Sequence, residues 1–195
     1  MDKKELRNQV KGALSQLSDE QYKGMSKQIT DQLLKEEAIK NAYTIAVTLS
    51  NKPEVDTYLL IEELWKGNKK VVVPKCNPKD RTMQFYKINS FNQLEKVYMN
   101  LKEPIVEITQ LVNSDEIDVI LVPGVVYDFD GYRIGFGGGY YDRYLVNYSG
   151  TLISLAFNIQ LIEKVPRESH DIPVNLIITE NKRIECGKKR KESLT

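Results

Sequence analysis

Cysteine and histidine are scarce in this chain of 195 residues, which contains two cysteines and one histidine. Cys76 and Cys186 lie far apart and form no Cys-x-x-Cys pair, and His170 cannot complete a usual zinc set with them. A structural zinc site is therefore not expected. Both thiols are expected to be free, as they would be in a reducing cytoplasm.

Long hydrophobic runs, a dominant charge and internal repeats are also absent. The first residues, Met-Asp-Lys-Lys-Glu-Leu-Arg, lack the apolar core of a secretory signal, and no run approaches membrane-spanning length. The formal net charge is +1, which gives little support to nucleic-acid binding. Because no linker divides the chain, we expect one domain over residues 1–195, with a solvated basic tail from about residue 182.

Hydrophobic periodicity predicts alternating helices and strands, the pattern of an α/β protein. Helical spacing and capping residues predict helices over residues 3–17, from Ser18 to about residue 39, after Asp56-Thr57, over 91–99 and from Tyr140. About six strands are expected, over residues 44–49, 70–74, 83–88, 119–122, 152–157 and 175–179. Residues 100–117 are interpreted as a connection.

Four of the eleven glycines lie between residues 135 and 139. Such a loop lets backbone N–H groups approach a phosphate, and a helix starting at Tyr140 would attract an anion at its N-terminus. Arg133 and Arg143 flank the loop, and Asp142 is placed to hold Mg²⁺. A glycine-rich turn capped by Asp142 explains the pattern equally well. The loop is neither a Walker loop nor a dinucleotide fingerprint.

The first predicted helix begins with the basic residues Lys3, Lys4 and Arg7, where positive charge opposes the helix dipole. Lys3 and Arg7 are four residues apart and share a face, so both could reach one anionic ligand. A solvated basic terminus is the simpler explanation of this feature taken alone.

Two polar segments follow predicted strands. Asn51, Glu54 and Asp56 come after the first strand, and ligands bind at the carboxyl ends of strands in open α/β sheets. Capping and turn formation explain Asn51 and Asp56 as well. His170 and Asp171 lie in a loop bounded by prolines. Without a serine or cysteine partner in a recognisable elbow, they indicate a turn more than a catalytic triad.

Taken in order, these motifs resemble those of the 5-formyltetrahydrofolate cyclo-ligase family, also called 5,10-methenyltetrahydrofolate synthetases. The matching segments span nearly the whole chain and agree in order and spacing. They are Lys3-Lys-x-x-Arg7, Glu54-Val-Asp-Thr57, Val122-Pro-Gly-Val-Val-Tyr-Asp128, Arg133-Ile-Gly-Phe-Gly-Gly-Gly-Tyr-Tyr-Asp-Arg-Tyr-Leu145 and Val165-Pro-x-x-x-His-Asp171. The fourth segment is highly specific to the family.

The resemblance implies a single three-layer α/β/α domain with a mostly parallel open sheet. It also implies an ATP- and Mg²⁺-dependent ring closure of 5-formyltetrahydrofolate to 5,10-methenyltetrahydrofolate, with release of ADP and phosphate. In that reaction the formyl oxygen attacks the γ-phosphate, and N10 attacks the resulting imidate phosphate. The implied partners are these small molecules, with no nucleic acid or membrane, for a cytoplasmic monomer or weak homodimer.

The resemblance assigns roles to particular positions. The implied ATP contacts are Lys3, Lys4, Arg7, Arg133, Ile134, Gly135, Phe136, Gly137, Gly138, Gly139, Tyr140 and Tyr141. The implied folate contacts are Asn51, Glu54, Asp56, Phe136, Gly137, Gly138, Gly139 and Tyr140. Mg²⁺ is assigned to Asp142 and Asp171, and catalysis to Arg133, Tyr140 and Arg143. Some family members carry a basic residue in place of Phe136 or Gly138.

Two alternatives stay open. A nucleotide-binding regulatory or interaction domain without turnover would keep the glycine loop. A sugar-phosphate or CoA-handling enzyme would also account for the loop, but not for the paired Asp142 and Asp171.

Overall fold

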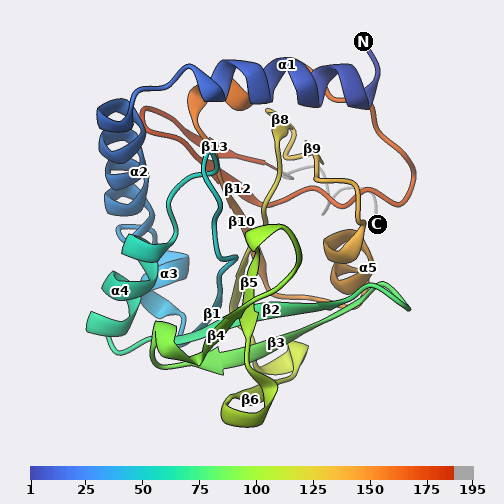
Figure 1. Ribbon diagram of the computed structural model, residues 1–195. Coiled ribbons are helices and arrows are strands. Elements are labelled where there is room, and N and C mark those ends of the chain that lie inside the picture. The colour runs from blue at the N-terminus through green and yellow to red at the C-terminus, as the bar shows by residue number, and fades with distance from the viewer. Residues whose placement is uncertain (187–195) are drawn as a thin grey trace, which may run out of the picture.

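The computed structural model describes residues 1–186, and these residues fold around an eight-stranded sheet with the strand order β13-β12-β10-β7-β1-β2-β3-β6 (Figure 1). Its strands are β1 (Thr44–Ala46), β2 (Lys70–Asn77), β3 (Thr82–Ile88), β6 (Gln110–Val112), β7 (Val119–Leu121), β10 (Thr151–Leu155), β12 (Leu176–Ile178) and β13 (Arg183–Glu185). The central strands β12, β10, β7, β1 and β2 are parallel neighbours, and antiparallel strands flank them. The predicted α/β fold with a mostly parallel open sheet is confirmed. The basic run at residues 188–191 lies outside the described residues.

The central strands are short and apolar because both of their faces are buried. Side chains alternate along β1, so that Ile45 and Val47 join one core while Ala46 joins the other. The first core packs against α1 (Lys3–Ser15), α2 (Asp19–Leu33) and α4 (Tyr58–Lys66), and the second against α5 (Tyr140–Leu145). Figure 1 shows α2, α3 (Glu37–Asn41) and α4 on one side of the sheet and α5 on the other, with α1 across the end. These are the expected three layers.

The N-terminal helices begin where their capping residues place them. The side chain of Asp2 accepts from the backbone N–H groups of Lys4 and Glu5, and Ser18 forms the predicted capping box with Gln21. The second helix is shorter than predicted, because the chain turns after Leu33 through i→i−3 hydrogen bonds and resumes as α3.

The predicted helix over residues 91–99 is wrong. This segment forms a short 3₁₀ turn, then β4 (Leu94–Lys96), which pairs antiparallel with β5 (Lys102–Pro104). Met99 and Asn100 make the hairpin turn with φ values of 57° and 59°. Residues 100–117, interpreted as a connection, therefore contain β5 and β6, and the main sheet has eight strands where about six were expected.

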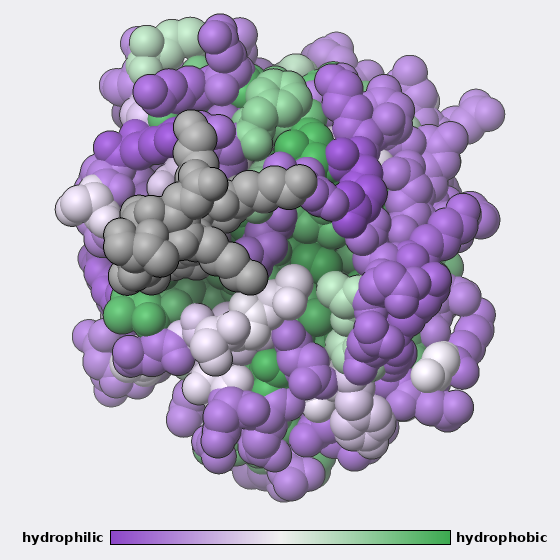
Figure 2. All heavy atoms as spheres, turned by 180° about the vertical axis from the view of Figure 1, so that it is seen from behind, coloured by the Kyte–Doolittle hydropathy of each residue, from purple (hydrophilic) through white to green (hydrophobic). Residues whose placement is uncertain are grey.

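The face opposite to that of Figure 1 is covered largely by hydrophilic side chains, which surround a hollow with hydrophobic residues on its floor (Figure 2). None of the helices within residues 1–186 combines the length and apolar character needed to span a lipid bilayer.

Candidate active site

A narrow cleft with about 40 Å³ of free space opens at the carboxyl ends of the neighbouring parallel strands β1, β7 and β10. Its lining residues come from the last residues of these strands and from the segments that follow them: Thr48, Ser50, Glu54, Val55, Thr57, Leu121, Val122, Pro123, Gly124, Tyr127, Leu155 and Gln160. Parallel strands bring their carboxyl ends to one edge of a sheet, which is where ligands bind in this class of fold.

Glu54 is the one carboxylate among the residues that line this cleft. Its Oε2 atom accepts a hydrogen bond of 2.6 Å from the backbone N–H of Asn51. Burial raises the pKa of Glu54, and this hydrogen bond and the charge of Lys11 oppose the shift. The segment that carries Glu54 is fixed by Thr57, whose hydroxyl donates to the carbonyl of Thr48 at 2.6 Å. Glu54 is therefore an acceptor held in the lining of the cleft.

The other two residues predicted near this strand serve the loop itself. The carboxylate of Asp56 accepts from the backbone N–H of Tyr58 at 2.9 Å, and its own N–H donates to Ser26. Asp56 thus satisfies the first backbone N–H of α4 from the position before the N-cap residue Thr57. Asn51 contributes its backbone N–H to Glu54. The capping alternative is therefore present at Asp56, and a role in binding folate stays a prediction for both residues.

The glycine loop runs from β9 (Arg133–Ile134) to α5. Gly137 and Gly139 have φ values of 107° and 68°, which favour glycine because a Cβ is strained there. Gly138 has no positive φ, but a Cβ at this position would lie 2.6 Å from the ring of Tyr140. Gly139 is the N-cap of α5, as the predicted helix start requires.

Arg133 ties the loop to two other segments. Its guanidinium, only 5% exposed, lies 3.0 Å from the carboxylate of Asp142 and donates at 2.8 Å to the carbonyl of Ile172. Arg143 donates at 3.0 Å to the carbonyl of Gly138. Both arginines predicted to act in catalysis therefore contact the loop or its neighbours.

Two loop residues point into the protein. The hydroxyl of Tyr141 shares a hydrogen bond of 2.5 Å with that of Thr48, and its ring packs edge-on against Phe85. Burial raises the pKa of Tyr141. The side chain of Ile134 is 1% exposed, and its carbonyl accepts from Val125. Tyr141 therefore fastens the loop to the end of β1, and Ile134 presents no side chain to a ligand.

Helix α1 lies against the glycine loop. The Nε of Arg7 donates to the carbonyl of Gly135 at 2.7 Å, and the Nζ of Lys11 lies 5.6 Å from the centroid of the exposed Phe136 ring. Arg7 therefore contacts the protein, and the explanation of a solvated basic terminus does not hold for this residue. Lys4 is exposed on the same helix.

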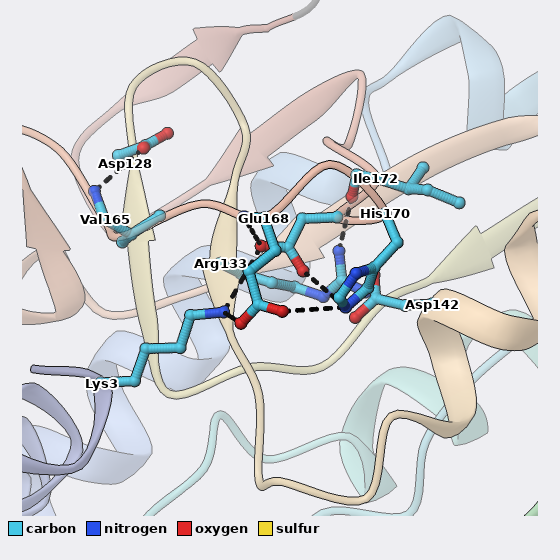
Figure 3. A network of polar contacts seen from close by, with 9 residues as sticks. Lys3, Asp128, Arg133, Asp142, Val165, Glu168, His170 and Ile172 are labelled. Atoms are coloured by element: carbon cyan, nitrogen blue, oxygen red, sulfur yellow. Dashed lines mark hydrogen bonds and ion pairs between the residues drawn. The ribbon is translucent and has the colours of Figure 1, made fainter.

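Lys3 reaches the loop that carries Asp171. Its Nζ lies 2.8 Å from Glu168 and 3.5 Å from Asp171, as part of the network in Figure 3. The carboxylate of Asp171 also accepts from the backbone N–H of Glu168 at 2.8 Å. His170 is exposed, with its Nε2 3.5 Å from Glu168, so it contacts carboxylates and forms no triad with a nucleophile in the described residues.

Asp142 and Asp171 are joined indirectly, because Arg133 contacts both Asp142 and the carbonyl of Ile172. Among residues 1–186, no group of three or more metal-binding side chains is assembled. Two carboxylates nevertheless suit Mg²⁺, which commonly takes one or two protein carboxylates and completes its octahedron with phosphate oxygens and water. In this structure each carboxylate has a cationic neighbour, Arg133 for Asp142 and Lys3 for Asp171.

Sequence reasoning missed several residues that build this region. Glu168 and Thr48 carry no motif signal, since they act through contacts between distant segments. The fully buried Asp128 accepts from Val165 at 3.1 Å and pairs with Arg167 at 2.9 Å. It therefore anchors the loop that contains Asp171, and only its place within the motif ending at residue 128 marked it.

The fold and this arrangement define an α/β protein with a small-molecule site at the carboxyl edge of its sheet. The family described as "5-formyltetrahydrofolate cyclo-ligase family" matches residues 1–180. The chain belongs to the 5-formyltetrahydrofolate cyclo-ligase family.

The similarity to known relatives extends over most of this chain and most of each relative. The 5-formyltetrahydrofolate cyclo-ligase of Escherichia coli K12 is 35% identical over 171 residues, which cover 85% of this chain and 93% of that protein. The Mus musculus enzyme of the same name is 28% identical, covering 92% and 94%. The NMR structure of Aquifex aeolicus 5,10-methenyltetrahydrofolate synthetase superimposes with a TM-score of 0.84 at 33% identity, covering 95% of this chain and 93% of that one. The synthetase from Mycoplasma pneumoniae gives 0.76 at 26% identity, covering 93% and 100%.

Proposed function

We propose that this chain closes 5-formyltetrahydrofolate to 5,10-methenyltetrahydrofolate with ATP, holding folate in the cleft and the ATP phosphates on the glycine loop. The contacts of helix α1 support placing the ATP phosphates on the glycine loop. Arg7 of α1 contacts Gly135, while Lys3 of the same helix contacts the loop of Asp171. Cationic side chains from the first helix therefore reach both the glycine loop and the loop that carries Asp171.

The folate is proposed to bind with its ring system against the cleft walls. Glu54 is the acceptor available to N–H groups of the ring, and its burial makes a hydrogen bond to it strong. Phe136 is 53% exposed on the glycine loop and offers a surface for an apolar part of the substrate. The loop residues from Phe136 to Tyr140 would then contact both ligands.

The protein's chemical work is to position two ligands and stabilise charge. The formyl oxygen attacks the γ-phosphate, the γ-phosphate leaves ADP, and N10 then attacks the formyl carbon and expels phosphate. Lys3, Arg7 and Arg143 are the cations proposed to neutralise the phosphates, with loop N–H groups adding hydrogen bonds. Arg133 is proposed to hold the loop in place, because its guanidinium is buried between Asp142 and Ile172.

Mg²⁺ is proposed to be held by Asp142 and Asp171 together with phosphate oxygens. When bound it would neutralise charge that develops on the transferred phosphoryl group. Arg133 and Lys3 already contact these two carboxylates. For the carboxylates to reach such an ion, each cation must either keep its contact beside the ion or move to a phosphate oxygen.

The test is a direct assay of the product. Purified protein mixed with 5-formyltetrahydrofolate, ATP and Mg²⁺ is expected to generate the near-ultraviolet absorbance of methenyltetrahydrofolate together with an equal amount of ADP. Reactions lacking ATP, or containing ADP in its place, are the controls. A nucleotide-binding domain without turnover predicts a thermal shift with ATP but no absorbance, and that result would refute the proposal.

We also propose that the chain acts as a single domain in the cytoplasm, as a monomer or weak homodimer with these small molecules as partners. Light scattering of the purified protein, with and without substrates, tests the oligomeric state.

A further inference from the structure

Lys3, one of the cations proposed to bind phosphate, already has an anionic partner within the chain. Its Nζ donates to Oε1 of Glu168 at 2.8 Å (Figure 3). The more distant carboxylate of Asp171 lies at 3.5 Å. The two ends of this contact are 165 residues apart in sequence. Glu168 therefore offers Lys3 a carboxylate where, in the proposed function, a phosphate oxygen would bind.

The Glu168 carboxylate can leave Lys3 without disturbing Asp171. The side chain of Glu168 is 56% exposed, whereas its backbone N–H is the group that donates to Asp171. A rotation of the side chain leaves that backbone hydrogen bond intact. His170 stands 3.5 Å from the other carboxylate oxygen.

Both partners are charged at neutral pH. The hydrogen bond from Lys3 lowers the pKa of Glu168 below its usual range. Partial burial lowers the pKa of Lys3, but the contacts with Glu168 and Asp171 outweigh this and raise it overall. A phosphate that approaches Lys3 thus meets an ion pair, and it must replace a carboxylate that already neutralises the lysine.

We propose that Glu168 competes with the ATP phosphates for Lys3 and thereby sets the affinity of the enzyme for ATP. This inference rests on the proposed role of Lys3 as a phosphate ligand. Because the pair is partly exposed, breaking it costs little, so the competition weakens ATP binding by roughly two- to fivefold. Glu168 is thus a determinant of nucleotide affinity that makes no contact with the nucleotide itself.

The experiment is a double-mutant cycle on ATP affinity. Dissociation constants for ATP with Mg²⁺ are measured by calorimetry without folate, so that no turnover occurs, for the wild type, Glu168→Gln, Lys3→Met and the double variant. Glu163→Gln removes an exposed carboxylate from the same segment and is the control. Glu168→Gln is expected to tighten ATP binding by roughly two- to fivefold, and Glu163→Gln to leave it unchanged. In the Lys3→Met background, Glu168→Gln is expected to have no effect.

Three results would overturn the inference, and each points to a different fault. Unchanged or weaker binding by Glu168→Gln means that the carboxylate does not compete. An equal gain with and without Lys3 means that Glu168 only repels the nucleotide through space, a contribution that added salt would screen. Unchanged binding by Lys3→Met removes Lys3 from the phosphate site. The product assay of the wild type tests the reaction itself independently of all three.

Discussion

Arg133 and Asp142, nine residues apart, form an ion pair of 3.0 Å across the two ends of the glycine loop. The arginine is almost fully buried, and its other terminal nitrogen donates to the carbonyl of Ile172. The loop is therefore closed upon itself and fixed to the segment of Asp171 by contacts within the chain. Asp142 consequently has two separable roles, one in holding Arg133 and one proposed in holding Mg²⁺.

Asp142→Asn separates these roles. The amide oxygen can still accept from Arg133, so the loop keeps its contact, but the negative charge proposed to bind Mg²⁺ is lost. Turnover is expected to fall by about 100-fold or more. The free energy of unfolding is expected to drop by about 1–3 kcal/mol, because the neutral amide keeps a hydrogen bond but leaves the buried guanidinium without its counter-charge.

The measurement is a titration with Mg²⁺ at saturating ATP and folate, together with thermal unfolding. A requirement for more Mg²⁺ marks the metal role. Normal turnover at ordinary Mg²⁺, with only reduced stability, would show that Asp142 serves the loop alone.

Gly137 and Gly135 form a matched pair for testing the loop backbone. A Cβ at either position meets nothing within 4 Å, but only Gly137 has a positive φ, of 107°. Gly137→Ala is expected to cost roughly 1–2 kcal/mol of stability through backbone strain, whereas Gly135→Ala costs little.

If this loop is also the phosphate cradle, Gly137→Ala should reduce the rise in unfolding temperature that Mg-ATP produces in the wild type. Equal ATP-induced shifts in both variants would mean that the geometry of Gly137 serves folding and not the nucleotide.

The parts of this molecule that sequence could predict are those determined by neighbours along the chain. The strand runs, the Ser18–Gln21 capping box and the helix start at Tyr140 depend on local spacing and were confirmed. The hairpin at residues 94–104 was missed because its apolar residues also fit helical spacing, and a turn at two non-glycine residues of positive φ gives no glycine signal.

The candidate site likewise combines features that are visible in the local sequence with contacts between distant segments. The glycines and the basic residues were visible as motifs, but their partners were not. Arg7 with Gly135, Lys3 with Glu168 and Tyr141 with Thr48 each join segments more than 90 residues apart. Only the packing of α1 and α5 against the sheet decides such pairs. For the same reason, the place of Tyr141 in the motif could not reveal its hydrogen bond to Thr48, and its predicted contact with ATP stays a prediction.

Arg7→Ala tests whether α1 takes part in nucleotide binding. The side chain loses its hydrogen bond to Gly135 and the charge proposed to meet phosphate. A charge-assisted contact of this kind is worth about 1.5–3 kcal/mol, so the apparent KM for ATP is expected to rise roughly tenfold or more, with a smaller change for folate.

Lys27→Ala removes a positive charge from the exposed pair with Asp31 on α2, away from these contacts, and controls for net charge. If Arg7→Ala leaves both KM values unchanged, then the contact with Gly135 only anchors the helix.

Glu54→Gln is expected to stabilise the protein at neutral pH while impairing its activity. Burial raises the pKa of Glu54, with the Asn51 N–H and Lys11 opposing this, so the folded state holds the proton more tightly than the unfolded state does. The stability that this proton contributes is complete below the unfolded pKa of about 4.3 and is lost as pH rises through the folded value. Glutamine is never ionised and can still accept from Asn51, so it escapes this loss.

The unfolding temperatures of the two proteins should therefore converge near pH 4 and separate as the pH rises toward about 7, with the variant higher. A wild type that is more stable than Glu54→Gln at neutral pH would mean that the hydrogen bond and Lys11 outweigh the cost of burial. Measurements of turnover and ATP binding then test whether the carboxylate of Glu54, which destabilises the fold at neutral pH, serves the reaction. A loss of turnover with ATP binding intact places Glu54 on the folate, whereas unchanged turnover would leave its burial without a functional reason.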